Sequence, residues 1–254
     1  MKPRKLLTRA LRLAPVALAI AMAAPEALPQ TVSVNLGTGQ GLTSGIVQLF
    51  AAITVLSLAP SILVMTTSFV RIVVVLSLLR TAIGLQNAPP NSVVISLSLF
   101  LTAFVMAPTF SEAYTAGIQP YMAEKMTLEE AIPKTLGPVQ AFMGKHAEPQ
   151  DVKLFADMAK ITNLKSPADA PFQVLAPAFM ISELKRAFEI GFMVFLPFLV
   201  IDLVVSSILM AMGMMMLPPV TISLPFKLIF FVLVDGWRLL AGSLVESFMQ
   251  GPGS

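Results

Sequence analysis

The sequence predicts an all-α membrane protein made of two long, kinked helical hairpins and a small helical domain outside the bilayer. Hydrophobic residues make up 56% of the chain and charged residues only 12%, a balance outside the usual range of soluble domains. Several apolar stretches approach or exceed the length that a helix needs to cross about 30 Å of hydrocarbon. A polar, proline-rich stretch divides them into two pairs, and each pair predicts one hairpin.

Residues 1–23 are predicted to be a cleavable signal peptide. Basic residues crowd the positions before residue 13, an apolar run of about twelve residues follows, and Ala21-Met22-Ala23 has the small-x-small form that signal peptidase reads. The run is too short for a transmembrane anchor, which needs about 20 residues. Residues 24–44 are rich in Pro, Gly, Thr and Gln, so we expect a flexible mature N-terminus.

Residues 45–110 are expected to form the first hydrophobic hairpin. Residues 45–65 carry no charge and are long enough to span the bilayer as a helix. The helical pattern then continues to the NAPPN motif at residues 87–91, which predicts either one kinked helix or two short ones. Residues 92–107 form the second apolar stretch, which Pro108 is expected to end.

Residues 111–185 are polar, mixed in charge and rich in proline, which predicts the small helical domain. Thr127 and Glu130 have the form of a capping box that opens a helix. A helix over residues 151–161 places Phe155 on its apolar face. Removal of the signal peptide leaves the N-terminus outside, and the crossings of the first hairpin return the chain to that side. The domain is therefore expected in the periplasm.

Residues 186–250 predict the second hairpin, with apolar stretches at residues 190–217 and 222–249. The dipeptide Pro218-Pro219 between them favours a tight turn. Residues 251–254 read GPGS and resemble a scar left by expression, so no structural role is expected for them.

Charged residues inside the predicted membrane helices need partners, because each lone charge costs about 2.5–3.5 kcal/mol there. They are Arg71, Asp202, Lys227, Asp235 and Arg238. Asp202 and Asp235 stand at similar distances from the prolines of the turn, about 23 Å along each helix. Arg238 follows Asp235 by one helical turn, which predicts a cluster of these three residues. A structural network is favoured over a proton or ion relay, because an arginine lies nearby and no histidine does.

Methionines crowd the predicted turn of the second hairpin in the string LMAMGMMMLPP. They are Met210, Met212, Met214, Met215 and Met216. Methionine often fills irregular gaps in a core, but adjacent residues cannot all face one side of a helix. If several copies surround an axis, the turn would supply a flexible apolar ring that excludes water, and Gly213 would give its backbone freedom. Packing and gating both stay open on the residues alone.

The residue types exclude several kinds of site. The chain has no cysteine, which excludes disulfides, thiolate nucleophiles and cysteine-bound metals. His146 is the only histidine, and in its polar stretch we expect a solvated side chain with no role. We therefore expect no metal and no other cofactor. A nucleic-acid partner is not expected, because the basic residues gather in the signal peptide and leave no basic stripe.

Three strings carry a resemblance to a known family. They read PSILVMTTSFVRIVVVLSLLRTAIGLQNAPPN at residues 60–91, APAFMISELKRAFEIGF at residues 176–192 and FLPFLVIDLVVSSILMAMGMMMLPPVTISLPFKLIFFVLVDGW at residues 195–237. Together with the hydrophobic segments between them, the strings extend the resemblance over about residues 45–248. The chain closely resembles the FliP family of flagellar export proteins and their injectisome counterparts, with the flagellar type the closer match.

The resemblance implies a core subunit of the type III export gate, in the flagellar basal body of the bacterial inner membrane. About five such chains would join FliQ-like and FliR-like subunits in a helical, conical assembly. This assembly would lie largely on the periplasmic side of the membrane, in contact with lipids and with FlhB-like and FlhA-like export components. Unfolded flagellar proteins would pass through its central pore.

The resemblance also implies roles for individual residues. The predicted pore gasket comprises Met212, Gly213, Met214, Met215 and Met216. The predicted contacts between subunits comprise Glu183, Lys185, Arg186 and Glu189, with Phe142 and Phe155 as further candidates. The alternating charges of the first four suit such contacts, although a solvated helix face would show the same pattern. Packing inside the small helical domain is the commoner fate of phenylalanines such as these two.

Two other functions compete with this interpretation. A secondary transporter would use Asp202 and Asp235 to bind a coupling ion near the membrane midplane, and it predicts inverted repeats. Residues 45–107 and 190–249 share no convincing similarity beyond both being hairpins. An intramembrane enzyme would need a Ser-His pair or an HExxH motif, and the sequence offers neither.

Overall fold

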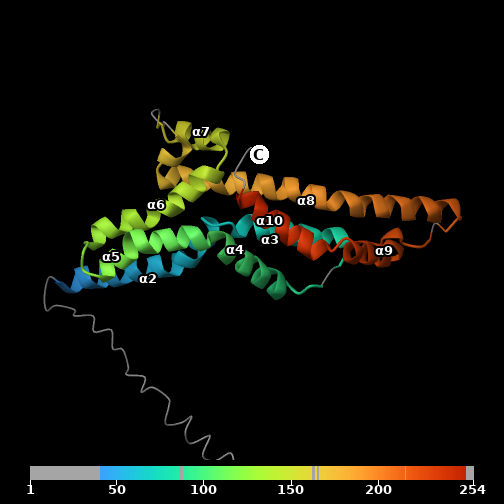
Figure 1. Ribbon diagram of the computed structural model, residues 1–254, viewed down its shortest axis with the longest axis horizontal. Coiled ribbons are helices and arrows are strands. Elements are labelled where there is room, and N and C mark those ends of the chain that lie inside the picture. Colours follow the sequence, from blue (N-terminus) through green and yellow to red (C-terminus); the bar gives the residue numbers. More distant parts are fainter. Residues whose placement is uncertain (1–40, 86–87, 162–163, 165, 215, 250–254) are drawn as a thin grey trace, which may run out of the picture. The chain divides into compact units, whose positions relative to one another are not determined.

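The computed structural model describes residues 41–85, 88–161, 164, 166–214 and 216–249, and all regular structure in these ranges is helical (Figure 1). The helices are α2 (Gly41–Met65), α3 (Phe69–Ile83), α4 (Asn91–Ala113), the π-helix η1 (Tyr114–Ile118), α5 (Gln119–Met122), α6 (Leu128–His146), α7 (Pro149–Met158), the 3-10 helix η2 (Pro167–Asp169), α8 (Phe172–Ala211), α9 (Pro219–Leu233) and α10 (Gly236–Met249). The predicted all-α class is confirmed. The predicted signal peptide, residues 24–40, Met215 and residues 250–254 lie outside the described residues.

The chain divides into two compact units, Met1–Leu56 and Ser57–Ser254. In the described part of the first unit, α2 begins at Gly41 rather than at the predicted residue 45. Val47 and Phe50 on this helix are exposed. Such exposed apolar side chains suit a helix that meets lipid or another chain.

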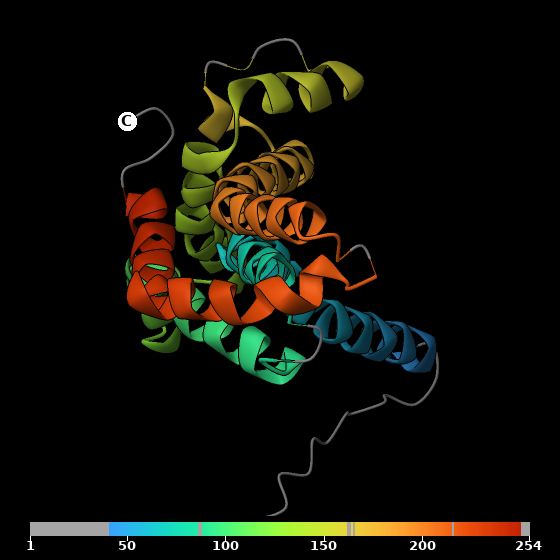
Figure 2. The same cartoon turned by 90° about the vertical axis from the view of Figure 1, so that its right-hand side faces the viewer.

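In the second unit, α3 lies between α8, α4 and the pair α9–α10 (Figure 2). Its residues Ile72, Val75, Leu76 and Leu79 are buried, and their spacing of i, i+3, i+4 and i+7 places them on one face of the helix. They pack in a core with residues of the four surrounding helices. These are Val94, Ala187, Phe198, Phe231, Leu240, Leu244 and Phe248.

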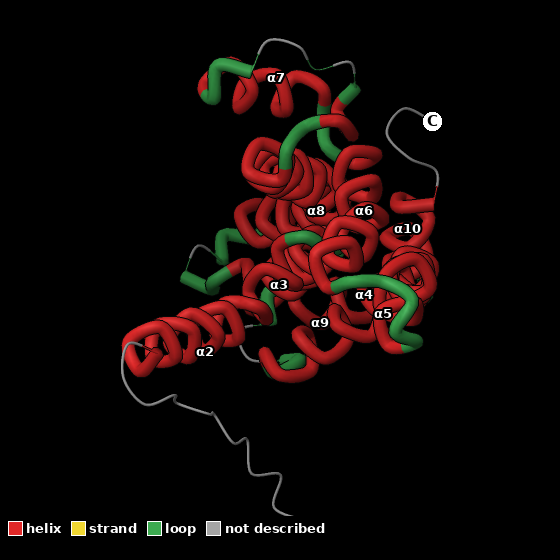
Figure 3. The backbone as a smooth tube through the Cα atoms, turned by 90° about the vertical axis from the view of Figure 1, so that its left-hand side faces the viewer, coloured by secondary structure: helices red, strands yellow, loops and turns green. Residues whose placement is uncertain are grey.

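A second, smaller core lies where α6 and α7 pack on the N-terminal half of α8 (Figure 3). Its buried residues are Met143, Ala147, Val152, Ala156, Ala170, Val174, Leu175, Ala178 and Phe179. This core occupies the part of the chain in which the sequence predicts a polar domain. The helix α6 begins after Thr127 as expected, but the Thr127 side chain makes no capping hydrogen bond. The start of the helix was therefore predicted correctly, and the capping box was not.

The helix α8 has 40 residues, which at 1.5 Å per residue gives a length of about 60 Å. The sequence predicts a boundary between the polar domain and the second hairpin near residue 185, but α8 runs through that point without a break. A hydrocarbon core of about 30 Å covers only half of this length. The helix is therefore about twice as long as a single upright crossing of the bilayer requires.

Two segments of the described chain are long and apolar enough to cross a membrane, Asn91–Met122 and Phe172–Ala211. The number rises to 4 if the bent pairs α2–α3 and α9–α10 each form one span. Pro108 does not end its helix as predicted, since α4 continues through it into η1 and α5. A proline removes one helical hydrogen bond, and that loss is tolerated where a neighbouring helix, here α6, packs alongside.

The helices α9 and α10 meet at an elbow of 62°. The sequence predicts one continuous helix over residues 222–249, but the chain breaks at Asp235, whose φ of 51° lies in the left-handed region. Gly236 allows a close approach, because a Cβ atom there would stand 2.2 Å from the ring of Phe231. The Asp-Gly dipeptide is a common turn signal and could have located this elbow.

Candidate functional site

The methionine turn, residues 210–217, joins α8 to α9. Gly213 has a left-handed φ of 73°, a conformation that glycine adopts without steric cost. The Gly213 amide donates to the carbonyl of Met210 at 3.0 Å, and the Met214 amide donates to the carbonyl of Leu209 at 3.0 Å. These two bonds form a Schellman C-cap that ends α8. Pro219 then opens α9 at a position where a helix leaves its amide unpaired.

The described methionines of this turn are exposed. Met216 is 98% exposed, Met212 is 62% exposed and Met214 is 44% exposed. In contrast, Met106 and Met143 are fully buried. The described methionines of the turn therefore fill no core of their own chain.

A partly buried ion pair closes the hairpin that carries the methionine turn. Lys227 on α9 places its Nζ 2.7 Å from Oδ2 of Asp202 on α8, and the Ser223 hydroxyl donates to Asp202 Oδ1 at 2.5 Å. Lys227 also donates to the carbonyl of Ala82 at 3.0 Å. That carbonyl belongs to the last turn of α3, where carbonyls lack helical partners and carry partial negative charge. These four residues, here named the lysine node, join α3, α8 and α9.

The predicted cluster of Asp202, Asp235 and Arg238 does not form. Asp235 lies at the elbow between α9 and α10, and its carboxylate is 3.9 Å from Arg238 Nη1 with both side chains exposed. Because the helix breaks at Asp235, this residue does not continue along α9 toward the level of Asp202. Asp202 pairs with Lys227 instead, which removes the carboxylate pair on which the transporter interpretation depended.

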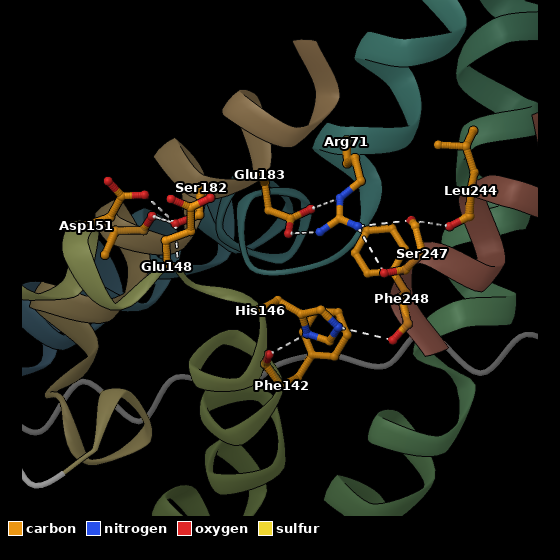
Figure 4. A network of polar contacts seen from close by, with 11 residues as sticks. Arg71, Phe142, His146, Glu148, Asp151, Ser182, Glu183, Leu244, Ser247 and Phe248 are labelled. Carbon is orange, nitrogen blue, oxygen red and sulfur yellow. Dashed lines mark hydrogen bonds and ion pairs between the residues drawn. The ribbon is translucent and has the colours of Figure 1, made fainter. Parts of the chain in front are cut away.

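A second buried ion pair joins α3 to α8 (Figure 4). Arg71 and Glu183 are 1% and 0% exposed. Arg71 Nε donates to Glu183 Oε2 at 2.8 Å, and Arg71 Nη2 donates to Glu183 Oε1. The remaining nitrogen, Nη1, donates to the Ser247 hydroxyl at 3.0 Å, and the guanidinium lies 3.8 Å from the ring centre of Phe248. These four residues, here named the arginine node, combine a two-pronged ion pair with a cation–π contact.

Two of the predicted contacts between subunits are used inside the chain. Glu183 is buried in the arginine node, so its side chain is not available to a neighbouring copy. Phe142 packs between the two cores, with ring centres 6.0 Å from Phe179 and 6.2 Å from Phe248. The expectation of a contact between subunits is therefore wrong for the buried Glu183 side chain. Phe142 packs inside its own chain, which is one of the two alternatives that the sequence left open for it.

The other predicted contacts lie near the start of α7 and along α8. Lys185, half exposed, pairs with Glu148 at 2.7 Å. The Ser182 hydroxyl accepts a hydrogen bond from the Glu148 amide at 2.8 Å and donates to Asp151 at 2.6 Å (Figure 4). These bonds fix the start of α7 on α8. Two predicted contact residues, Phe155 and Arg186, are partly buried, and Glu189 is exposed.

His146 is buried rather than solvated. Its Nδ1 lies 2.8 Å from the carbonyl of Phe142, and its Nε2 lies 3.2 Å from the carbonyl of Phe248 (Figure 4). Burial lowers the pKa of His146 below its ordinary value, although both carbonyls favour the protonated ring. The prediction of a solvated histidine is wrong, because its polar sequence neighbours did not reveal that α10 covers it.

The two nodes are suited to hold helices together. In each node both carboxylate oxygens accept a hydrogen bond, so each carboxylate is held between two helices. Within the ranges that the structure describes, no group of three or more histidine or acidic side chains could hold a metal ion. Paired buried charges of this kind fix the register of helices.

Comparison with protein-family models matches residues 52–244 to the FliP family. The chain belongs to the FliP family. Among FliP-family relatives, the flagellar biosynthetic protein FliP of Caulobacter vibrioides is 64% identical over 241 residues, which cover 95% of this chain and 90% of the relative. The FliP protein of Bacillus subtilis is 54% identical over 205 residues, which cover 81% of this chain and 93% of the relative. The FliP protein of Agrobacterium fabrum is 50% identical over 205 residues, which cover 80% of this chain and 84% of the relative.

The FliP-family match includes both ion pairs and the methionine turn. It confirms the resemblance that the three sequence strings indicated. It also confirms the expectation of a protein-export component that is not an enzyme. The Ser247 and Phe248 parts of the arginine node lie beyond the FliP-family match, at the end of α10.

Proposed function

We propose that this chain is a channel-forming subunit of the flagellar protein export apparatus in the bacterial inner membrane. Several copies surround a common axis, together with FliQ-like and FliR-like subunits, and unfolded flagellar proteins pass along that axis. Its relatives are flagellar biosynthetic proteins. Its long apolar helices suit a membrane assembly.

The observation that carries the proposal is the exposure of the methionine turn. Fully burying a methionine side chain contributes about 1.5–3 kcal/mol, and Met216 gains almost none of this within its own chain. A ring of such turns around an axis lets the thioethers cover one another. The ring excludes water and ions from a narrow pore without a charged barrier, and flexible methionine side chains can repack around a passing chain.

The lysine node supplies the rigid base that such a seal needs. Asp202 and Ser223 link α8 to α9 near the turn, and Lys227 ties both helices to α3. An ion pair in an apolar setting resists separation, because each lone charge would be left without solvent. The turn can therefore move while the helices that carry it keep their register.

The outer face of α8 supports contact with other chains. Phe188, Phe192, Leu199 and Leu203 are exposed along this helix, and their spacings place them on one stripe. A long apolar stripe of this kind marks a surface covered by lipid or by another protein chain. Packing of this stripe against neighbouring copies would bring the methionine turns together at one end of the α8 helices.

Cysteine cross-linking tests whether the turns of different copies meet. The natural chain contains no cysteine, so a single Met216→Cys substitution places one thiol in each copy. A disulfide needs Cα atoms within about 7 Å. We expect mild oxidation of assembled complexes in membranes to join Met216→Cys copies into covalent dimers.

The matched control is Met158→Cys, an exposed methionine at the end of α7. The helix α7 packs on the N-terminal half of α8, whereas the methionine turn follows the C-terminal end of α8, so we expect little cross-linking at Met158→Cys. A Met216→Cys yield no greater than the Met158→Cys yield would contradict the proposed ring of turns.

A further inference from the structure

We infer that protonation of His146 releases the end of α10 from α6. His146 and Phe248, here named the histidine latch, form the contact that holds this end in place (Figure 4). Both residues belong to one chain, so the inference goes beyond the proposed channel and does not depend on it. The contact also does not depend on which outer surfaces other chains cover in an assembly.

The histidine latch joins the ends of two helices. His146 is the last residue of α6, and Phe248 lies in the last turn of α10. The ring centre of His146 lies 4.4 Å from that of Phe142 and 5.4 Å from that of Phe248. Its Nε2 lies 3.2 Å from the Phe248 carbonyl, one of the last carbonyls of α10, which lack partners within the helix. The imidazole ring therefore contacts both the side chain and the backbone at the end of α10.

The two carbonyls beside the ring favour its protonation. Nδ1 lies 2.8 Å from the carbonyl of Phe142, and Nε2 faces the carbonyl of Phe248. A neutral imidazole has one N–H group and donates to one of them, whereas a protonated ring donates to both. These hydrogen bonds are one side of the balance that decides whether the ring in the closed latch accepts a proton.

Burial and nearby positive charges oppose protonation. The Arg71 guanidinium lies 3.8 Å from the ring centre of Phe248, and Lys145 precedes His146 on α6. Both cations disfavour a charged ring. Glu183 on α8 does not offset them, because its carboxylate is paired with Arg71. Burial is the largest of these effects and lowers the pKa of His146, so the closed latch holds the ring in its neutral form.

A cavity of about 540 Å³ lies beside the latch, between α4, α6 and α10. His146 and Phe248 form part of its wall, together with Lys145 and with Glu112 of α4. Glu112 and Glu246, the acids on α4 and α10 in this region, are exposed, so solvent screens their attraction for a charged ring. The helix α6 lies outside the candidate membrane spans. The cavity therefore gives protons from the aqueous side a route to a ring that is only 1% exposed.

The closed and released forms of the latch respond differently to acid. The closed form buries a protonated ring close to Arg71, whereas release of α10 exposes the same ring to water. The contribution of the latch is complete above about pH 6.5, the ordinary pKa of histidine. It is lost as the pH falls below that value, because the released form takes up the proton first. The last turn of a helix is also the part that opens most readily, so release does not require unfolding of the core.

Hydrogen exchange of backbone amides, followed by peptide mass spectrometry, tests the latch in the purified export complex containing the full chain. Exchange is compared near pH 7 and near pH 5, after correction for the intrinsic dependence of exchange on pH. We expect residues 244–249 to exchange severalfold faster near pH 5, and by at most about tenfold for each pH unit, since one proton is taken up. Residues 174–183 on α8 are the internal control and should keep their protection.

Two variants remove the titrating ring. His146→Gln keeps an N–H group that can donate to the Phe248 carbonyl, and His146→Met keeps an apolar side chain; neither takes up a proton in this pH range. We expect the corrected exchange of residues 244–249 in both variants to be the same near pH 7 and near pH 5. If a variant does not fold, the comparison within the natural chain still decides.

Three results would overturn the inference. The first is equal corrected exchange of residues 244–249 near pH 7 and near pH 5 in the natural chain. The second is a parallel loss of protection at residues 174–183, which would show that acid unfolds the subunit as a whole. The third is the same pH response in the folded His146→Gln or His146→Met variant as in the natural chain, which would assign the response to another group.

Discussion

Lys227 on α9 donates a 2.7 Å hydrogen bond to Asp202 on α8, and the same ammonium group donates to the carbonyl of Ala82 on α3. One side chain thus fixes three helices at the base of the methionine turn. The lysine is buried and the aspartate is partly buried, so the pair is screened less by water than a surface ion pair.

Removal of one partner of this ion pair should lower the free energy of unfolding more than removal of both partners does. Lys227→Met leaves the Asp202 carboxylate without its cation, and we expect a loss of about 3 kcal/mol, the lower end for a buried pair because Asp202 keeps some contact with solvent. The double variant Lys227→Met with Asp202→Leu should recover a large part of this loss. Thermal unfolding of the detergent-solubilised protein measures the difference, and equal losses in the single and double variants would argue against the pair.

The arginine node predicts a larger effect of the same kind. Arg71→Met leaves Glu183 uncompensated at 0% exposure, and we expect a loss of about 5 kcal/mol, the upper end for a buried pair. Adding Glu183→Leu should restore stability in part. Protease resistance of the solubilised subunit provides the measurement, with Glu189→Leu, an exposed acid on the same helix, as the control. If the Arg71→Met subunit kept normal stability and failed only to form oligomers, the result would contradict the buried pair and support a contact between subunits at Glu183.

The depressed pKa of His146 predicts that acid destabilises the fold. The unfolded chain binds a proton near pH 6.5, whereas the buried ring binds it only at lower pH. The contribution of His146 is therefore complete above about pH 6.5 and is lost as the pH falls below that value, because the unfolded state takes up the proton first.

Because His146 is the only histidine, its titration can be isolated. Thermal unfolding midpoints between pH 7 and pH 5 measure the effect, and we expect His146→Gln to flatten the decrease. Parallel pH profiles for the natural chain and for His146→Gln would show that another group is responsible.

A side chain at Gly213 should lower stability, although space is available around it. A Cβ atom there meets nothing within 4 Å, but the left-handed φ of 73° costs about 1–2 kcal/mol for a residue with a side chain. We expect Gly213→Ala to weaken the C-cap and lower thermal stability by about that amount. Gly242→Ala is the control, since it also has open space and lies inside α10 without a positive φ. Equal effects at both positions would contradict the role assigned to the backbone of Gly213.

The fold follows from the sequence where local signals act. Pro218 and Pro219 located the turn of the second hairpin, and Thr127 marked the start of α6. Hydropathy alone did not locate the elbow at Asp235, because apolar residues continue on both sides of it. The breaking signal there is the Asp-Gly dipeptide, which acts through backbone conformation rather than through polarity.

The site is only partly visible in the sequence, because its pairs are distant along the chain. Arg71 and Glu183 stand 112 residues apart, and no spacing rule connects them. Asp202 and Lys227 were both recognised as charges that need partners, but the assumption of straight helices paired Asp202 with Asp235 instead. The methionine turn was recognised by composition, while its exposure required the structure.

The central claim is that the methionine turn seals a pore between copies of the chain. Ion conductance of the assembled complex tests this claim most directly. The variant Met214→Ala with Met215→Ala and Met216→Ala removes side-chain volume and flexibility from the turn. Leucine at the same three positions keeps the turn apolar, and alanine at the exposed Met122 on α5 controls for loss of a methionine elsewhere. We expect the triple alanine variant to assemble normally and to conduct small ions, while both controls stay closed. An assembled triple alanine variant as tight as the natural complex would contradict the seal.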